Sequence, residues 1–195
     1  SSNKTVIGLH NAELVNVGIS IYNASNVIIR NLQIEYCRTI SNLIIKDGAH
    51  HVWVDHCSFR NEINKGDGYY DGLLDIGASS ERITNYVTVS WCKFTDADQA
   101  SLIGSWQRTN DLGSNLTTFH HNLYQRVIER GPKSYQTNTH VFNNYYYTSA
   151  AHGGYNGVAI APTYGAVILA ENNYFEDFLG TPLTTNYNEQ GGELP

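Results

Sequence analysis

Two aspartates lie four positions apart in the stretch YYDGLLDIGASS, residues 69–80, where an apolar run ends in a turn. Residues i and i+4 of an extended strand share one face but lie roughly 13 Å apart, so Asp71 and Asp75 can reach one ion only if the backbone bends between them at Gly72. The pair is therefore either a site for one ion, or a solvated turn acid at Asp71 with a strand-end cap at Asp75.

Two other pairs of titratable residues suggest chemistry but have simpler explanations. Asp55 and His56 occur together in VWVDH, where they resemble an acid–base dyad. Adjacent strand residues point to opposite faces of a sheet, so we expect that these two cannot both face one substrate. His120 and His121 have no partners at the spacing that zinc sites require. We therefore expect no metal at the two histidines, and we expect one of Asp55 and His56 to support the strand on the metal side by hydrogen bonding and the other to be structural.

Length and charge narrow the class of protein. The chain has 195 residues, a formal net charge of −6 and no cluster of lysines and arginines, which argues against nucleic acid or an anionic membrane surface as the main partner. No apolar stretch is long enough to cross a membrane. We therefore expect residues 1–195 to form a single domain that exists as a monomer.

Sequence features also bear on localisation. The chain contains no methionine and begins with Ser1, so we expect a processed, trimmed or partial chain. Asn-X-Ser/Thr sequons occur at Asn3, Asn23 and Asn115. Such tripeptides also arise by chance in a chain rich in asparagine, but together they favour a secreted, extracellular glycoprotein.

A repeated pattern of eight residues indicates the elements that must position these side chains. Each octad alternates apolar positions with polar or bulky ones, and the six octads begin at Val27, Val52, Val87, Thr117, Thr139 and Ile168. The segments between the octads are rich in turn residues and show no amphipathic pattern of helical length. Strands at this spacing are typical of a solenoid, in which each strand stacks on its equivalent in the previous coil.

The sixth position of each octad should form a column in the solenoid. Its members are Leu32, Cys57, Cys92, Asn122, Asn144 and Asn173. Side-chain amides stacked at the strand spacing of ~4.8 Å can hydrogen-bond to one another and to turn backbone, which gives asparagine a structural reason to recur there. Cys57 and Cys92 would then be either small buried apolar residues or a disulfide, and Cys37 has no assigned role.

The solenoid is the preferred of two all-β architectures. An antiparallel sandwich also has strands separated by turns, but hairpin signals are scarce and the repeat intervals are too long and irregular for simple meanders. We therefore predict an all-β fold, a single-stranded right-handed parallel β-helix.

Nine short motifs, taken in order, resemble the pectate lyase and pectin lyase family of polysaccharide lyases. They are SNKTVIG, NVIIRNL, VWVDHCSF, YYDGLLDI, YVTVSWCKF, ASLIGS, HHN, RGP and HVFNNYYY. The resemblance covers residues 2–178. It implies a parallel β-helix that cuts polygalacturonate, an acidic plant cell-wall polysaccharide, by β-elimination, usually with calcium. Similar proteins carry further sequence on both sides, so the chain resembles a shortened relative or a fragment.

The resemblance also implies a set of calcium ligands. Asp71 and Asp75 occupy positions where similar enzymes bind calcium. A third acid of the family falls on Asn42, which can still offer a carbonyl oxygen, and a further acid falls on Ile40, which can offer nothing. Because calcium takes six to eight oxygen ligands, we expect a weak site that fills when substrate carboxylates complete its shell.

Arg130 in VIERGPKS occupies the position of the arginine that similar enzymes use to remove the C5 proton of the substrate. Arginine side chains in proteins are in general protonated, so its weaker role is to lie beside that proton and stabilise the developing negative charge. The alternative for Arg130 is a surface ion pair with Glu129, which precedes it.

Three further positions bear on substrate binding. A substrate-binding lysine of the family falls on Gln99 and a second arginine falls on Tyr135, so two positive charges are absent, whereas Lys133 resembles an arrangement found in pectin lyases. We expect these three residues to bind substrate. The preferred function is a calcium-assisted pectate lyase. The alternatives are a calcium-independent pectin lyase acting on methyl-esterified pectin and a non-catalytic pectin-binding β-helix.

Overall fold

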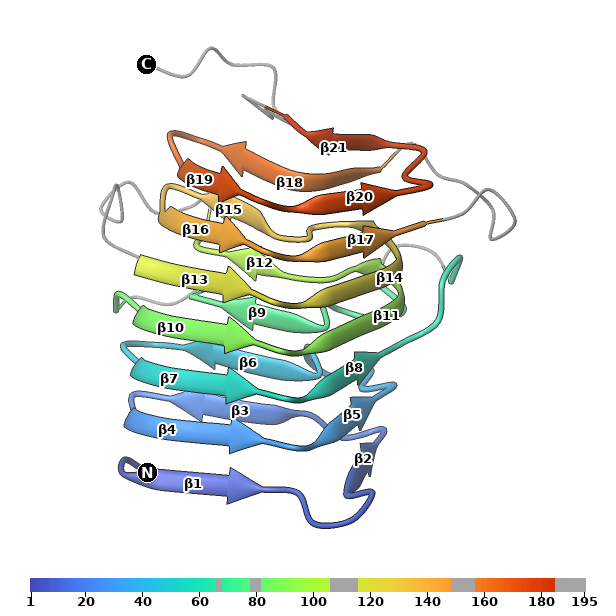
Figure 1. The fold of residues 1–195 in the computed structure, drawn as a ribbon. Helices are drawn as coiled ribbons and strands as arrows, with labels where there is room; N and C mark the ends of the chain where they lie inside the picture. Colours follow the sequence, from blue (N-terminus) through green and yellow to red (C-terminus); the bar gives the residue numbers. More distant parts are fainter. Residues whose placement is uncertain (66–67, 78–81, 106–115, 149–156, 185–195) are drawn as a thin grey trace.

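The chain forms a parallel β-helix, as the octads predicted. The computed structural model describes residues 1–65, 68–77, 82–105, 116–148 and 157–184. Within these residues, 21 strands form three sheets of seven, and the paired strands run parallel. Successive strands along the chain join the three sheets in turn, so that the coils stack along one axis (Figure 1). None of the described residues forms a helix long and apolar enough to span a bilayer.

The three sheets are named A, B and C, and in each of them the strands follow one another in the spatial order below. Sheet A contains β1 (Lys4–Ile7), β4 (Ser25–Arg30), β7 (His50–Asp55), β10 (Asn85–Ser90), β13 (Leu116–His120), β16 (Asn138–Phe142) and β19 (Val167–Glu171). Sheet B contains β2 (Glu13–Val15), β5 (Gln33–Glu35), β8 (Ser58–Arg60), β11 (Lys93–Gln99), β14 (Leu123–Glu129), β17 (Tyr145–Tyr147) and β20 (Tyr174–Glu176). Sheet C contains β3 (Ile19–Tyr22), β6 (Leu43–Lys46), β9 (Leu74–Ile76), β12 (Leu102–Ile103), β15 (Lys133–Tyr135), β18 (Val158–Thr163) and β21 (Thr181–Leu183).

Inward-facing side chains fill the interior as columns. Along sheet B, the aromatic rings stack from coil to coil, with centroid separations of 5.3 Å for Phe59 and Phe94, and 4.8 Å for Phe94 and Tyr124. The column continues through Tyr146 to Phe175, with separations of 4.7 and 4.6 Å. Because parallel strands in register place equivalent residues side by side, a period of one coil in the sequence becomes a continuous core.

The predicted asparagine ladder is present at the bend between sheets A and B. The side-chain amide of Asn122 donates to Oδ1 of Asn144 at 3.0 Å, and the amide of Asn144 donates to Oδ1 of Asn173 at 3.0 Å. Cys57 and Cys92 continue the column as buried free thiols, so the disulfide alternative is wrong and the apolar alternative is confirmed. The ladder therefore holds the bend by hydrogen bonds rather than by a covalent link.

We expect replacement of Asn144 by alanine to destabilise the protein by about 1–3 kcal/mol. The substitution removes an amide that is buried and leaves the backbone N–H of Asn122 and the carbonyl of Phe119 without their partners. Urea unfolding measures the change. Asn143→Gly is the matched control, because Asn143 is exposed and has a φ of 55° that glycine tolerates. Equal midpoints for the two variants would contradict a stabilising role for the ladder.

Asp55 and His56 are in contact, so the prediction that they face opposite sides is wrong. His56 Nδ1 lies 2.8 Å from Oδ2 of Asp55. The reason is that β7 ends at Asp55 and His56 has a φ of 51°, in the left-handed region, so its side chain turns back instead of alternating. Asp55 is buried and also accepts hydrogen bonds from Ser90 Oγ and Arg30 Nε.

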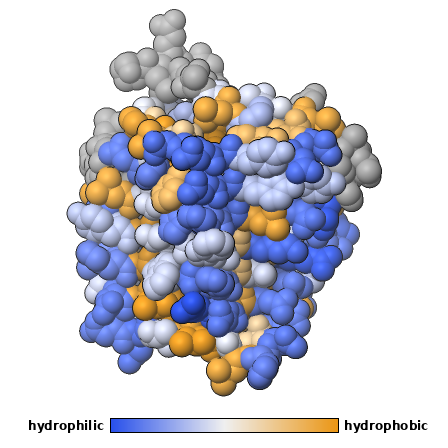
Figure 2. Space-filling model, viewed as in Figure 1, coloured by the Kyte–Doolittle hydropathy of each residue, from blue (hydrophilic) through white to orange (hydrophobic). Residues whose placement is uncertain are grey.

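The surface carries two of the three predicted sequon asparagines in exposed positions. Asn3 and Asn23 are exposed, and Asn115 lies outside the described residues. Figure 2 shows hydrophilic residues over much of the face drawn in Figure 1, with hydrophobic residues concentrated near both ends of the solenoid. Those at the first coil include Val6, Ile7 and Leu9.

Candidate active site

The backbone bends between Asp71 and Asp75, at Leu73 rather than at the predicted Gly72. Asp75 lies in the middle of β9, and the chain makes a bend at Leu73 just before this strand. A Cβ atom placed on Gly72 would lie 2.5 and 2.8 Å from the two carboxylate oxygens of Asp75. The carboxylate therefore folds back over Gly72, and only glycine leaves room for it.

Asp75 is a buried carboxylate whose charged form is disfavoured. Its residue surface is 3% exposed. Its Oδ2 accepts a hydrogen bond from Ser41 Oγ at 2.7 Å, and its Oδ1 accepts one from the backbone N–H of Leu102 at 2.8 Å. Burial, followed by the negative charge of Asp71, raises the pKa of Asp75 to about 6, although these hydrogen bonds and the positive charge of Arg130 act in the opposite direction.

Arg130 lies on the same side of the solenoid as Asp75. The backbone N–H of Leu73 donates to the carbonyl of Ala100 at 2.7 Å, and that of Ala100 donates to the carbonyl of Glu129 at 3.0 Å. The segments that carry Asp75 and Arg130 are therefore separated by a single intervening segment of the next coil. Arg130 is also close enough for its charge to lower the pKa of Asp75.

The Arg130 side chain is mostly buried and lies next to Glu129. It is 19% exposed, and its Nε lies 3.5 Å from Oε1 of Glu129, which is the ion pair that was the alternative to a catalytic role. That Nε is buried and makes no hydrogen bond to the residues that the structure describes. The backbone of Arg130 has a φ of 64°, and its carbonyl accepts a hydrogen bond from the N–H of Ser101 at 2.6 Å. The backbone is thus fixed, and part of the guanidinium reaches the surface beside Glu129.

Gln99 lies beside Asp71 in a small polar pocket. The pocket is lined by Asn61, Glu62, Gly68, Tyr70, Asp71, Asp98 and Gln99. Glu62 and Asp98 add negative charge there, and sequence reasoning did not single out either residue. Only Asp98 had a signal, its position next to Gln99 in DADQ. The pocket is thus acidic and lies on the side of the solenoid that carries Asp71.

Asn42 lies next to the aspartate pair, because its backbone N–H donates to the carbonyl of Gly72 at 3.2 Å, but its side chain is bound elsewhere. Asn42 is fully buried, its Oδ1 accepts a hydrogen bond from the N–H of Cys37, and its amide donates to the carbonyls of Ile34 and Arg60. Both ends of the side chain thus bind backbone groups of this coil and the next, and the preceding residue, Ser41, makes the contact with Asp75. We therefore leave Asn42 out of the proposed ligands.

Lys133 and Tyr135 are buried in β15, which argues against direct contact of either residue with a polymer. Lys133 is 2% exposed, and its Nζ lies 5.3 Å from the centre of the Tyr135 ring. The Tyr135 ring in turn stacks on Tyr164 of the next coil, with a centroid separation of 5.4 Å. We therefore treat both residues as support for the site and keep Gln99 as the surface candidate.

Asp71 and Asp75 have the type of ligand atom that calcium prefers, but they are too few to complete its shell. Asp71 and Asp75 offer oxygen ligands, and their mutual repulsion is relieved by a cation. In the described part of the chain, no three His, Cys, Asp or Glu side chains lie close enough together to hold a metal ion. Two carboxylates cannot supply the six to eight oxygens that calcium takes, so water and substrate must supply the rest.

Comparison with known proteins identifies the family of this chain. The sequence model of a family described as "Pectate lyase" matches residues 1–190. A pectate trisaccharide-lyase of Thermotoga maritima is 38% identical over 157 residues, which cover 74% of this chain and 40% of the relative. A pectate trisaccharide-lyase of Bacillus licheniformis is 33% identical over 194 residues, which cover 98% of this chain and 53% of the relative.

A solved structure supports the fold in particular. The structure of a pectate lyase bound to a hexasaccharide matches with a TM-score of 0.77 at 26% identity, over 96% of this chain and 53% of that one. The chain thus spans about half the length of the relatives that it matches. Because the family model covers nearly all of its residues and the coils match a solved member, the chain belongs to the pectate lyase family.

Proposed function

We propose that this chain carries the catalytic centre of a calcium-assisted pectate lyase, which cleaves polygalacturonate by β-elimination to unsaturated oligogalacturonates. The observation that supports the proposal is that the segments with Asp71, Asp75 and Arg130 lie on one side of the solenoid. The positive charge of Arg130 lowers the pKa of Asp75. Membership of the pectate lyase family supports the reaction class. The relatives that are named pectate trisaccharide-lyases support polygalacturonate as the substrate.

The reaction needs positive charge at a defined place. Elimination removes the proton at C5 of a galacturonate unit, next to its carboxylate, and expels the glycosidic oxygen from C4. Negative charge therefore builds at a centre that already carries an anion. Fixed cationic groups aimed at that centre stabilise the transition state more than water does, because they need no reorganisation during the reaction.

Two groups of residues would supply positive charge at two places on one uronate unit, its carboxylate and its C5 atom. Asp71 and Asp75 would hold calcium, which supplies a positive charge that neutralises the uronate carboxylate. Arg130 would lie beside the C5 proton, where its guanidinium stabilises the charge that develops as the proton leaves. Ser41 and the N–H of Leu102 fix the orientation of the Asp75 carboxylate. Gln99, beside Asp71, would donate a hydrogen bond to the polymer.

We expect absorbance from the new C4–C5 double bond to grow when the chain is incubated with polygalacturonate and calcium. A chelator should abolish the signal, because without a cation the uronate carboxylate and the two aspartates repel one another. Methylated pectin is the parallel substrate. If the absorbance instead increases with methylated pectin in the presence of chelator, the chain is a pectin lyase. If the chain binds oligogalacturonate but releases no unsaturated product, it is a non-catalytic module.

The biological setting follows from the same proposal. An enzyme of this activity would act on acidic polysaccharide of the plant cell wall as a secreted, extracellular protein, and the exposed Asn3 and Asn23 would be available for glycosylation. The net charge of −6 would repel the anionic polymer, so the bound cation would also invert the local field at the site.

A further inference from the structure

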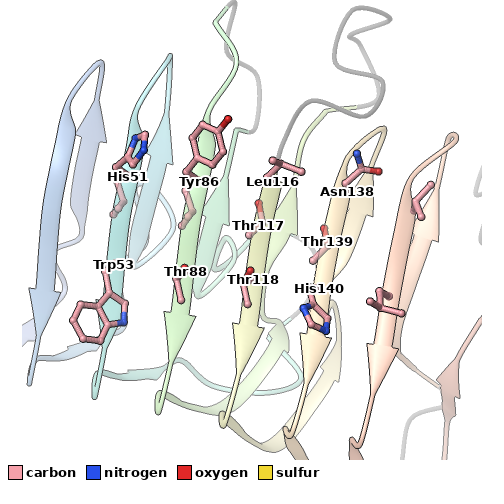
Figure 3. A pocket seen from close by; sticks show the side chains of 14 residues that line it. His51, Trp53, Tyr86, Thr88, Leu116, Thr117, Thr118, Asn138, Thr139 and His140 are labelled. Carbon is pink, nitrogen blue, oxygen red and sulfur yellow. The ribbon is translucent and has the colours of Figure 1, made fainter.

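A groove crosses the outer face of sheet A, on a different sheet from Asp75. It has a volume of about 650 Å³ and crosses β7, β10, β13, β16 and β19. Neighbouring strands are ~4.8 Å apart, so the groove extends over about 19 Å along the solenoid. In Figure 3, Trp53, Thr88, Thr118 and His140 form one row, and His51, Tyr86, Leu116 and Asn138 form a second row beside it. The groove can therefore take an extended chain.

Trp53 is a rigid aromatic surface at the β7 end of the groove. Its residue surface is 41% exposed, yet its indole N–H donates to Ser90 Oγ at 2.8 Å. Ser90 in turn donates to Oδ1 of the buried Asp55 at 2.8 Å. This chain of hydrogen bonds fixes the orientation of the indole, so that a ligand stacking on the ring meets a side chain that is already ordered.

Small polar side chains separate Trp53 from His140 along the same row. The hydroxyls of Thr88 and Thr118 make no hydrogen bond to any other residue that the structure describes, so they remain available to a ligand. Tyr86, in the second row, is exposed and its ring packs on His51 with a centroid separation of 4.8 Å. Aromatic surfaces beside free hydroxyls suit a ligand that has apolar ring faces and many hydroxyl groups.

The charge of the groove selects among such ligands. Among the described residues, its lining contains no lysine, arginine, aspartate or glutamate. His140, at one end of its row, already contacts an acid, because its Nε2 lies 2.8 Å from Oε2 of Glu171. A polyuronate would therefore find no fixed cation here, unlike at Arg130. A neutral polymer would leave no charge unpaired on either side.

We infer that the groove of sheet A is a binding site for a neutral polysaccharide, which stacks a sugar ring on Trp53 and hydrogen-bonds to Thr88 and Thr118. The site is separate from the proposed lyase centre, because Asp75 lies in sheet C and Arg130 follows β14 of sheet B. Its existence does not depend on lyase activity. In a cell wall, such a site would hold the protein on neutral polymers near its acidic substrate.

Affinity electrophoresis tests the inference. The whole chain is run in gels that contain galactan, arabinan, xyloglucan, mixed-linkage β-glucan or polygalacturonate, and the dissociation constant is taken from the retardation. We expect at least one neutral polymer to retard the wild-type chain, and Trp53→Ala to weaken that binding at least tenfold. Thr118→Arg, which fills the floor of the groove without touching the core, should weaken it similarly, and this keeps the test valid if Trp53→Ala unfolds.

Trp91→Ala is the matched control. Trp91 is 55% exposed, lies on the turn after β10 and is not part of the groove lining, so its removal should leave the retardation unchanged. Retardation by none of the neutral polymers, or equal retardation of wild type, Trp53→Ala and Thr118→Arg, overturns the inference. Self-association that Trp53→Ala abolishes would overturn it too, and would assign the face to a second copy of the chain.

Discussion

Replacing Arg130 by alanine should lower the turnover number on polygalacturonate by about a thousandfold with little change in the Michaelis constant. The guanidinium is expected to act on charge that exists only as the C5 proton leaves, and loss of one such group typically reduces the rate by a hundred- to a thousandfold or more. Initial rates of double-bond formation at saturating calcium measure the effect. The guanidinium, which is 19% exposed and whose Nε lies 3.5 Å from Oε1 of Glu129, would have to leave this ion pair or share it with the substrate.

Two further variants separate a chemical role for Arg130 from the loss of a charge. Arg130→Lys keeps the charge but lacks the planar donors, so we expect it to recover at most about tenfold of the lost rate. Arg126→Lys is the control, because Arg126 pairs with Asp96 on sheet B, outside the proposed site, so its replacement should leave the rate on polygalacturonate unchanged. If Arg130→Ala kept more than a tenth of the wild-type rate, Arg130 would have no part in proton removal.

Asp75→Asn should make the chain more stable than wild type at pH 8 in the absence of calcium, by about 3 kcal/mol. The pKa of Asp75 rises from 3.8 to about 6 on folding, so the folded state binds this proton more tightly than the unfolded state does. The resulting stability is present below pH 3.8 and is lost as the pH rises through 6. A shift of about two pH units corresponds to about 3 kcal/mol, which the asparagine variant does not lose.

With calcium at pH 8, the wild-type chain should instead be more stable than Asp75→Asn. An ion that binds only the folded wild-type chain raises its melting temperature, whereas Asp75→Asn should no longer respond. Thermal melts at pH 8 and pH 4, with calcium or with chelator, measure both effects, and the two proteins should converge at pH 4. Asp177→Asn is the control, because Asp177 is exposed and its φ of 48° suits asparagine. If the wild-type chain were more stable than Asp75→Asn at pH 8 in chelator, burial of the charged Asp75 carboxylate would not destabilise the folded state.

The fold was predictable because the β-helix repeats one local rule. Strands stacked in register turn a sequence period into columns, so the spacing alone assigns Asn122, Asn144 and Asn173 to the ladder that their hydrogen bonds form. The sequence did not predict the Asp55–His56 contact, because side chains alternate between the two faces only within a strand and β7 ends at Asp55. A single residue in the left-handed region at the bend is enough to reverse the direction of a side chain.

The site was predictable only in part. The spacing of Asp71 and Asp75 indicated a bend between them, since no straight strand could bring them to one ion, and the structure has this bend at Leu73 rather than at Gly72. The inward direction of Asn42 could not be deduced in that way, because it depends on backbone groups of neighbouring coils. The burial of Tyr135 likewise depends on Tyr164, which is distant in the sequence. Contacts between coils therefore decide which candidates reach the surface.

The most direct test of the central claim is a crystal structure of Arg130→Ala with calcium and an oligogalacturonate. The account predicts an ion bound to carboxylate oxygens of Asp71 and Asp75, with its shell completed by a uronate carboxylate and water. It also predicts that the C5 proton of that uronate faces residue 130. Calcium bound elsewhere, or an oligosaccharide whose C5 lies away from residue 130, would contradict the account.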